Sequence, residues 1–353
     1  MAWILLFLLA MNIRPLSESA PNRQPQLAAA NGQVGMVFGS GGSILFAQSK
    51  DNGETFSAPV RVATLPVLAL GHHRGPRIAF AGKTILISAV SGQTPATDEH
   101  AHGLAADGDL LLWRSTDGGR TWSQPVAIND VPRSAREGLH AMAADAQGHA
   151  AAVWLDLRAK GTRLYGAFSD DAGLTWSKNL LVYESPAGTI CECCHPSLVS
   201  AGGGEFVVMF RNVLDGMRDM YVVRVRNGKV VAKPQKTGVN FWPLKACPMD
   251  GGSVALENGR VVSAWRREER VFLAEPGREI PLGRGKDVSM TVGKKGPYVA
   301  WNDGSRIEVS EPGSAAPVTL SQSGAFPALT ALSDGSVLAA WEESGSIATR
   351  RLR

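Results

Sequence analysis

One unit recurs seven times along the 353-residue sequence, and this repetition constrains the fold more than any other feature. Each copy is a short apolar strand, a turn with glycine, and a second apolar run that ends in an aromatic residue in every copy but one. The last residues of the copies are Phe38, Ala89, Trp154, Phe210, Trp265, Trp301 and Trp341. This pattern predicts seven antiparallel hairpins, each supplying the two inner strands, A and B, of a repeated sheet.

A second signature follows three of the hairpins. Its pattern is Ser-x-Asp-x-Gly-x-Thr-aromatic, known as an Asp box, at residues 49–56, 115–122 and 169–176. The aspartate accepts hydrogen bonds from turn amides, the glycine takes a positive φ, and the aromatic ring packs beneath the hairpin. We therefore expect Asp51, Asp117 and Asp171 to build turns between outer strands C and D rather than to catalyse a reaction.

Repeats of about 40 to 65 residues, each containing several short strands, are typical of propeller blades. The sequence predicts an all-β fold, a β-propeller of antiparallel four-stranded blades, with seven blades by repeat count, although six also fits because the last blades are short. At the level of blades and Asp boxes, residues 25–350 resemble the sialidase (neuraminidase) superfamily. Its members have six blades and carry Asp boxes in these hairpins.

The first 20 residues differ from the repeats. An apolar stretch from Ala2 to Met11 precedes the small residues Ser17, Ser19 and Ala20. This stretch is too short to span a bilayer and is typical of a cleaved export signal. We expect residues 1–20 to be a signal peptide, residues 21–353 to form an exported propeller, and no stable membrane span to remain after cleavage. Export also makes disulfides permissible.

The charge balance argues against one class of partner. The formal net charge is +4 and is spread along the chain without a lysine or arginine run. We therefore expect no nucleic-acid partner.

Propeller topology sorts the polar residues by face. Loops that join strand D to the next A, and B to C, lie on one face, whereas A–B and C–D turns lie on the other. This map places all four cysteines on the first face together with His72, His73, His100, His102, His140 and His195. Only His149, in an A–B turn, falls on the opposite face. We predict that the first face holds the functional site.

The resemblance implies that a cluster of arginines on this face holds a substrate carboxylate, as suits bidentate recognition. The candidates for substrate binding are Arg74, Arg77, Arg136, Arg158, Arg211 and Arg266. Arg77-Ile78 resembles the start of the family's Arg-Ile-Pro motif, with Ala79 in place of the proline. Arg211 and Arg266 follow the inner strands of blades four and five and complete our first choice.

The resemblance also implies a tyrosine nucleophile, a glutamate that polarises it, and an aspartate as acid/base. The candidates are Tyr183, Glu137 and Asp156, although the two carboxylates fit equally well as structural partners of arginines. None of the four tyrosines has a recognisable nucleophile context. Whether the protein is an enzyme therefore stays open; if it is one, we expect a sialidase-like glycoside hydrolase.

The stretch CECCHP concentrates soft ligands in six positions. Together with one later cysteine it offers the candidate metal ligands Cys191, Cys193, Cys194, His195 and Cys247. Thiolate and imidazole ligands suit copper or zinc. Two alternatives remain open: disulfides, of which a bridge from this stretch to Cys247 is the natural one, and reactive thiols.

Three functions follow from these observations. The first is recognition of an anionic carbohydrate, with or without its hydrolysis. The second is a copper- or zinc-binding propeller that uses the cysteine and histidine loops. The third is a propeller without catalysis that binds a glycan or a protein.

Overall fold

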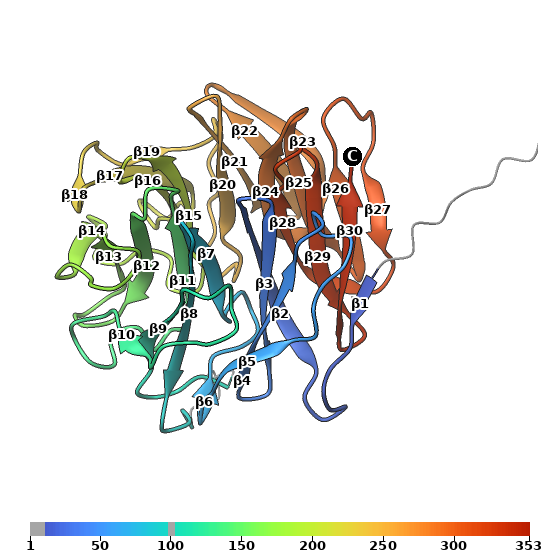
Figure 1. Ribbon diagram of the computed structural model, residues 1–353. Helices are drawn as coiled ribbons and strands as arrows, with labels where there is room; N and C mark the ends of the chain where they lie inside the picture. The colour runs from blue at the N-terminus through green and yellow to red at the C-terminus, as the bar shows by residue number, and fades with distance from the viewer. Residues whose placement is uncertain (1–10, 98–102) are drawn as a thin grey trace, which may run out of the picture.

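The computed structural model describes residues 11–97 and 103–353, which form seven antiparallel sheets (Figure 1). The predicted all-β propeller is therefore confirmed, with seven blades. Within the described ranges no segment forms a helix that could cross a membrane. His100 and His102 lie outside those ranges.

The first three blades follow the chain in order. Blade 1 contains β2 (Asn22–Ala30), β3 (Gln33–Ser40), β4 (Ser43–Ser49) and β5 (Val60–Thr64). Blade 2 contains β7 (Arg77–Ala81), β8 (Thr84–Gly92), β9 (Asp109–Ser115) and β10 (Val126–Ala127), with β6 (Val67–Leu68) also paired to β8. Blade 3 contains β11 (His140–Ala144), β12 (Ala150–Asp156), β13 (Arg163–Ser169) and β14 (Leu180–Tyr183).

Blades 4 to 6 repeat the same order. Blade 4 contains β15 (Ser197–Gly202), β16 (Glu205–Arg211), β17 (Met220–Arg226), β18 (Lys229–Val230) and β19 (Gln235–Lys236). Blade 5 contains β20 (Gly252–Glu257), β21 (Arg260–Arg267), β22 (Arg270–Glu275) and β23 (Arg278–Arg284). Blade 6 contains β24 (Lys286–Gly293), β25 (Gly296–Asp303), β26 (Arg306–Ser310) and β27 (Val318–Ser321).

Blade 7 joins the two ends of the chain. It contains β28 (Gly324–Ala331), β29 (Val337–Glu343), β30 (Ser346–Leu352) and, as its outer strand, β1 (Met11–Ile13). β1 lies beside β30 at one edge of the molecule (Figure 1). It falls within residues 1–20, so cleavage of the predicted export signal after residue 20 would remove this strand.

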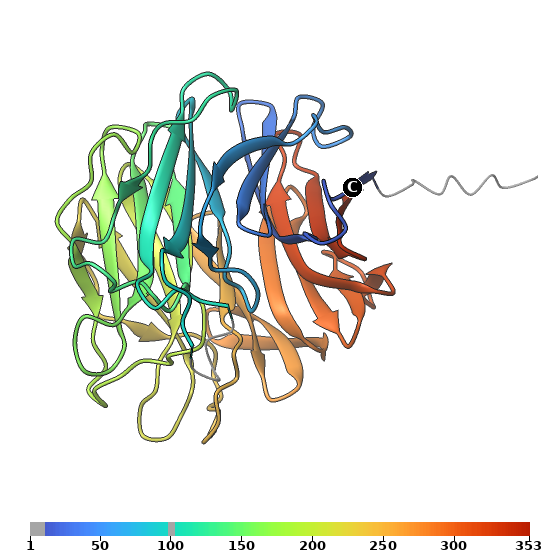
Figure 2. The ribbon, with the colours of Figure 1, turned by 90° about the horizontal axis from the view of Figure 1, so that it is seen from below.

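The inner strands close a ring. Each inner strand contacts the next in the order β2, β7, β11, β15, β20, β24 and β28, and β28 contacts β2 again. In the view from below, the red sheets near the C-terminus lie next to the blue sheet near the N-terminus (Figure 2). Because each sheet twists, its faces pack against both neighbours, and the closed ring protects the free edges of the inner strands.

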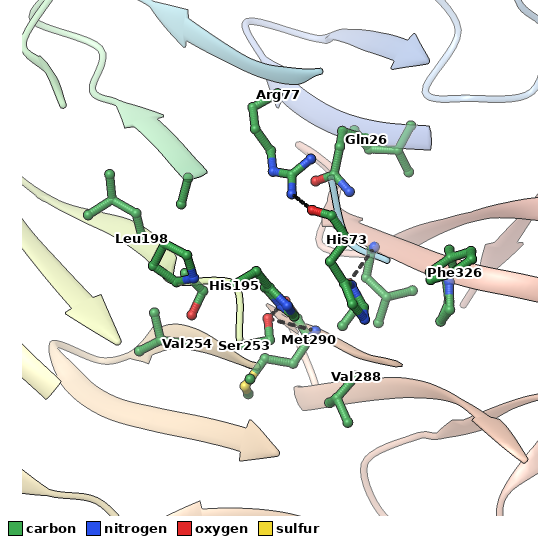
Figure 3. A pocket seen from close by; sticks show the side chains of 18 of the residues that line it. Gln26, His73, Arg77, His195, Leu198, Ser253, Val254, Val288, Met290 and Phe326 are labelled. Carbon is green, nitrogen blue, oxygen red and sulfur yellow. Dashed lines mark hydrogen bonds between the residues drawn. The ribbon is translucent and has the colours of Figure 1, made fainter. Parts of the chain in front are cut away.

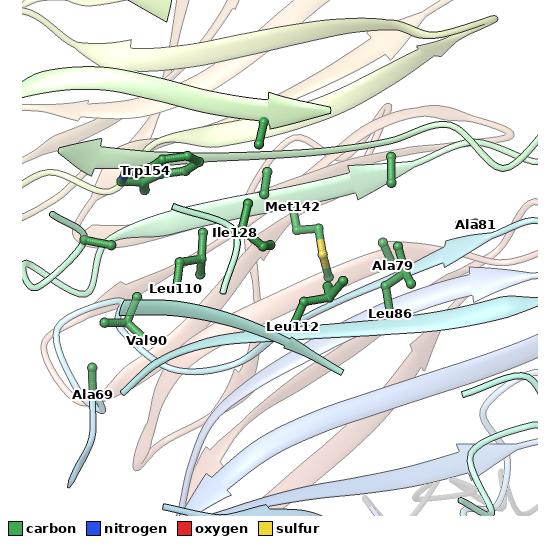
Figure 4. Packing of buried hydrophobic residues seen from close by; sticks show 14 of the residues in the cluster. Ala69, Ala79, Ala81, Leu86, Val90, Leu110, Leu112, Ile128, Met142 and Trp154 are labelled. Atoms are coloured by element: carbon green, nitrogen blue, oxygen red, sulfur yellow. The ribbon is translucent and has the colours of Figure 1, made fainter. Parts of the chain in front are cut away.

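The core lies between adjacent blades. In one cluster, Leu86, Leu110 and Leu112 of blade 2 pack toward Met142 and Trp154 of blade 3 (Figure 4). Trp154 is fully buried and donates its Nε1–H to Asp156 Oδ2 at 2.8 Å. The aromatic residue that ends a repeat thus fills the space between two blades while its polar atom keeps a partner.

The three Ser-x-Asp-x-Gly-x-Thr-aromatic segments form the turns between strands C and D. In the first, Asp51 Oδ1 accepts from Thr55 N at 2.9 Å, and Asp51 Oδ2 accepts from Thr55 Oγ1 at 2.5 Å. Ser49 Oγ accepts from Gly53 N at 2.8 Å. Asp117 and Asp171 accept the same pair of hydrogen bonds from Thr121 and Thr175, so all three aspartates are turn-building groups.

Candidate functional site

Strand A of three blades begins with a β-bulge. The register shifts occur between Arg23 and Gln26 in β2, between Lys286 and Ser289 in β24, and between Ala325 and Ala328 in β28. In each bulge one residue has a positive φ, namely Gln24 (55°), Asp287 (57°) and Phe326 (50°). Such bulges redirect side chains, and strained residues of this kind gather at functional sites.

In blade 2 an interrupted inner strand positions a histidine. Its inner strand is split into β6 and β7, both paired with β8, and the intervening segment loops out. In that segment Arg74 N donates to Gly71 O at 3.0 Å, which closes a turn around His72 and His73. Both histidines have positive φ, 50° and 64°. Non-glycine residues adopt this conformation only at an energetic cost, so the turn holds His73 in one particular position.

These loops surround a pocket of about 220 Å³ on the propeller axis. Its polar rim includes His73, Arg77 and His195, and its wall includes Phe326 and Met290 (Figure 3). The lining residues come from blades 1 to 7 and, within the described parts of the chain, include no tyrosine. The pocket is therefore the point at which the loops of all blades meet.

His73 is the centre of the polar cluster. Its Nε2 lies 2.7 Å from Asp287 Oδ1 and 3.9 Å from Asp250 Oδ1. Its ring stacks on His195, with 4.1 Å between ring centroids and 24° between the planes. His195 Nδ1 in turn accepts from Gly251 N at 3.2 Å. The cluster thus joins blades 2, 4, 5 and 6 at the mouth of the pocket.

The pKa values of the two carboxyl groups are shifted in opposite directions. Burial, reinforced by the charge of Asp287, raises the pKa of Asp250. Burial also opposes ionisation of Asp287, but the hydrogen bond and charge of His73 outweigh it and lower the pKa of Asp287. Asp250 Oδ1 is buried and has no hydrogen-bond partner among the described residues. Two neighbouring carboxyl groups with opposite shifts are typical of acid–base sites.

Two of our three first-choice arginines lie beside this cluster. Arg77 lines the pocket and donates to the carbonyl oxygens of His73, Gly75 and Pro76, and burial lowers its pKa to about 10. Arg266 Nε lies 3.2 Å from Asp250 Oδ2, an ion pair without hydrogen-bond alignment. Both guanidinium groups therefore place positive charge near the mouth.

The third arginine does not reach the mouth. Arg211 is 1% exposed, and its guanidinium donates to the carbonyl oxygens of Asp250, Arg218 and Arg266. Its three backbone acceptors come from the loop before β17, the loop before β20 and the strand β21. Arg211 therefore ties the loops of blades 4 and 5 together behind the site.

The remaining predicted arginines have local partners. Arg74 pairs with Glu137 at 2.7 Å and is 2% exposed. Arg158 pairs with Asp156 at 2.8 Å and stacks over Tyr165. Arg136 donates to the carbonyl oxygen of a neighbouring residue on the surface.

The three residues predicted to catalyse are not brought together. Glu137 is held by Arg74, and burial raises its pKa despite that partner. Asp156 is buried and accepts from Trp154 and Arg158. Tyr183 lies in the outer strand β14, where its hydroxyl accepts from Asn212 at 3.0 Å. None of the three lines the axial pocket.

The cysteines adopt two states. Cys193 and Cys247 form a disulfide, whereas Cys191 and Cys194 are free and buried. His195, grouped with them as a candidate metal ligand, instead points into the axial pocket. The sulfur atoms of Cys191, Cys193 and Cys194 lie within 4.8 Å of one another, but the disulfide leaves only two free thiols as ligands.

A second group within 4.8 Å joins His73, Asp250 and Asp287. His73 and Asp287 share a hydrogen bond, and Asp250 Oδ1 lies 3.9 Å from His73 Nε2, so we interpret the group as an acid–base cluster. Sequence reasoning missed both aspartates. The only signal in the sequence was their position: Asp250 lies two residues before the inner strand β20, and Asp287 is the second residue of the inner strand β24.

No protein-family model matches the chain, and no curated protein matches it in sequence. Solved structures do match. The Hadza microbial sialidase Hz136 superposes with a TM-score of 0.55 at 15% identity, over 98% of this chain and 68% of that one. The chain has a sialidase-like propeller fold, with seven blades rather than the six that the resemblance implied.

Two further structures share this sialidase-like fold across nearly their whole length. The intramolecular trans-sialidase from Ruminococcus gnavus has a TM-score of 0.52 at 12% identity, and 94% of each chain is covered. The polysaccharide lyase PL25, an ulvan lyase bound to -[GlcA(1-4)Rha3S]-, has a TM-score of 0.55 at 11% identity, over 98% of this chain and 96% of that one. Identities this low establish the fold alone.

Proposed function

We propose that this exported propeller binds an anionic carbohydrate at the mouth of its axial pocket, and that His73 transfers a proton during cleavage of a glycosidic bond. One observation carries the proposal: His73, held by Asp287 at 2.7 Å, faces a pocket that Arg77 and His195 also line. An oriented imidazole beside cationic groups suits proton transfer near a bound anion.

Two observations favour an anionic carbohydrate as the ligand. Arg77, even with its pKa lowered to about 10, remains cationic at neutral pH. The proteins of similar fold include sialidases and a lyase bound to a glucuronate-containing sugar, and both sialic acid and glucuronate carry a carboxylate. Guanidinium groups recognise carboxylates well.

The proton-transfer role falls on His73 for a geometric reason. A sialidase-type covalent route needs a tyrosine at the sugar, and Tyr183 lies in an outer strand with its hydroxyl bound to Asn212. His73 is partly exposed to the pocket, and its ring orientation is set on one edge by Asp287 and on one face by His195. Acid–base cleavage through His73 therefore needs no rearrangement of the blades.

The test combines two substrate panels with one matched pair of variants. Sialosides are assayed for released sialic acid, uronate-containing polysaccharides for the ultraviolet absorbance of unsaturated products, and binding of both by calorimetry. We expect His73→Asn to lose cleavage by about 10²- to 10⁴-fold while binding persists. His149→Asn is the control, because His149 also pairs with an aspartate at 2.7 Å but lies in an A–B turn on the opposite face.

Two results would overturn the proposal. One is the absence of both binding and cleavage for every anionic carbohydrate tested. The other is a His73→Asn variant that cleaves at the rate of the unmodified protein.

A further inference from the structure

The four cysteines place a disulfide directly beside two free thiols. The Sγ atoms of Cys191 and Cys194 lie 3.8 Å and 3.9 Å from Cys193 Sγ, and 3.1 Å from each other. Cys193 is bonded to Cys247 across 54 residues of sequence. Thiol–disulfide exchange requires a thiolate at contact distance from a disulfide sulfur, and here two thiols satisfy this requirement.

One of the two thiols is better placed as the nucleophile. Arg218 Nη1 donates to Cys191 Sγ at 3.1 Å, and the guanidinium of Arg211 lies close enough to add its charge. Hydrogen bonding from a cation stabilises a thiolate, which is the reactive form. Cys194 is as buried as Cys191, at 1% and 0% exposure, but among the described residues its sulfur receives no hydrogen bond from an arginine. Cys191 is therefore the attacking sulfur and Cys194 the resolving one.

Exposure gives the exchange a direction. Cys191 and Cys194 are buried, Cys193 is half-buried, and Cys247 is exposed in the loop between β19 and β20. A thiolate released at Cys247 is solvated by water, whereas one released in the interior is not. The spacing Cys191-x-x-Cys194 is also that of dithiols that readily form a disulfide.

We propose that these cysteines form a thiol–disulfide exchange unit that moves the disulfide from Cys193–Cys247 to Cys191–Cys194. The Cys191 thiolate attacks Cys193 Sγ, the Cys191–Cys193 bond forms, and Cys247 leaves as a thiolate. Cys194 then loses its proton to Cys247 and attacks Cys191 Sγ, which releases Cys193 as a thiolate. The number of disulfides is unchanged, so these two steps need no external oxidant or reductant.

The product is an outward-facing dithiol. Two electrons have moved from the buried Cys191/Cys194 pair to Cys193 and the exposed Cys247. The chemical class of partner for such a dithiol is an external disulfide, which Cys247 would attack and Cys193 would resolve with release of two thiols. The exchange would also remove the covalent link between the loop before Asp250 and the loop before His195, because the Cys193–Cys247 disulfide joins these two loops.

The experiment uses the full chain, purified without reductant under anaerobic conditions. Iodoacetamide is added at neutral pH, samples are quenched over time, and labels and disulfides are mapped by peptide mass spectrometry. We expect labels to accumulate on Cys247 and Cys193 while a Cys191–Cys194 disulfide appears. Labelling of buried Cys191 and Cys194 ahead of Cys247 would overturn the proposal, as would a Cys193–Cys247 bond that persists throughout.

Two variants separate the two steps. Cys191→Ser removes the nucleophile, so we expect Cys247 to stay unlabelled and the original disulfide to persist. Cys194→Ser leaves the first step intact, so we expect labelled Cys247 together with a trapped Cys191–Cys193 disulfide. Equal labelling of Cys247 in the Cys191→Ser variant and the unmodified protein would contradict the mechanism.

Metal content provides an independent check. Copper or zinc that co-purifies in proportion to the protein and is lost in Cys191→Ser would show that the thiols hold a metal, and this too would overturn the proposal. Thermal unfolding of both variants tests whether they are folded. The trapped intermediate in Cys194→Ser keeps the proposal testable if Cys191→Ser fails to fold.

Discussion

His73 and Asp287 are 214 residues apart in sequence, yet His73 Nε2 lies 2.7 Å from Asp287 Oδ1 at the propeller axis. The contact joins blade 2 to blade 6 across the mouth of the pocket rather than through neighbouring blades. Both residues have a positive φ, 64° for His73 and 57° for Asp287. Two independent strained segments are thus held in place around one polar contact.

The first prediction concerns the energy of this contact. Because both side chains are largely buried, removing either one leaves the other without its partner. We expect a double-mutant cycle with His73→Asn and Asp287→Asn, measured by urea unfolding at neutral pH, to give a coupling of about 1 to 2 kcal/mol. Strictly additive effects of the two substitutions would show that the contact contributes nothing to stability.

The blades could be predicted from sequence because their signal is local. Each hairpin carries its own apolar alternation, its glycine turn and its final aromatic residue, and residues such as Trp154 and Trp341 are buried between blades. Neighbouring repeats then need only to stack. Closure by β1 could not be predicted in this way, since its pairing with β30 joins opposite ends of the chain.

The site was harder to predict because its geometry is not local. A positive φ at Gln24 or Asp287 is set by bulges that depend on pairing with the next strand. Arg211 satisfies the sequence pattern for a substrate arginine, but carbonyl oxygens up to 55 residues away occupy its guanidinium. The pairing of Cys193 with Cys247 was one of several that four cysteines allow.

The second prediction concerns acid stability. Hydrogen bonds from Thr55, partly opposed by burial, lower the pKa of Asp51 from 3.8 to about 2. A carboxyl whose pKa is lower in the folded state stabilises the fold above pH 3.8, and this contribution is lost as the pH falls toward about 2. We expect Asp51→Asn to flatten the fall of the unfolding midpoint across this window. A parallel shift of the whole curve would contradict the assignment.

The third prediction concerns closure of the ring. Ile13 of β1 is 9% exposed and packs with Met36, Phe38 and Ile347, so its side chain helps to join blade 7 to blade 1. In the full-length chain, which keeps residues 1–20, we expect Ile13→Ala to lower the free energy of unfolding by about 2 to 4 kcal/mol, since it removes a buried side chain. Leu16→Ala is the control, because Leu16 is 66% exposed, and we expect a change within about 0.5 kcal/mol. Similar effects of the two substitutions would mean that β1 does not stabilise the ring.

The fourth prediction concerns the support of the site. A Cβ at Gly251 would lie 2.2 Å from His195 O and 2.7 Å from His195 Nδ1, so Gly251→Ala must displace the histidine that stacks on His73. We expect a loss of about 1 to 3 kcal/mol of stability, as overpacking usually costs. We also expect weaker carbohydrate binding, measured by calorimetry.

Gly42→Ala is the matched control for this substitution, because its Cβ would also meet a backbone carbonyl, Leu65 O, at 2.5 Å, but in a turn that does not line the pocket. Both variants should therefore be destabilised, and only Gly251→Ala should bind less carbohydrate. If both variants lose binding in proportion to stability, the effect is one of global unfolding. In that case His195 has no specific part in shaping the mouth, and the stacked pair of histidines serves the fold alone.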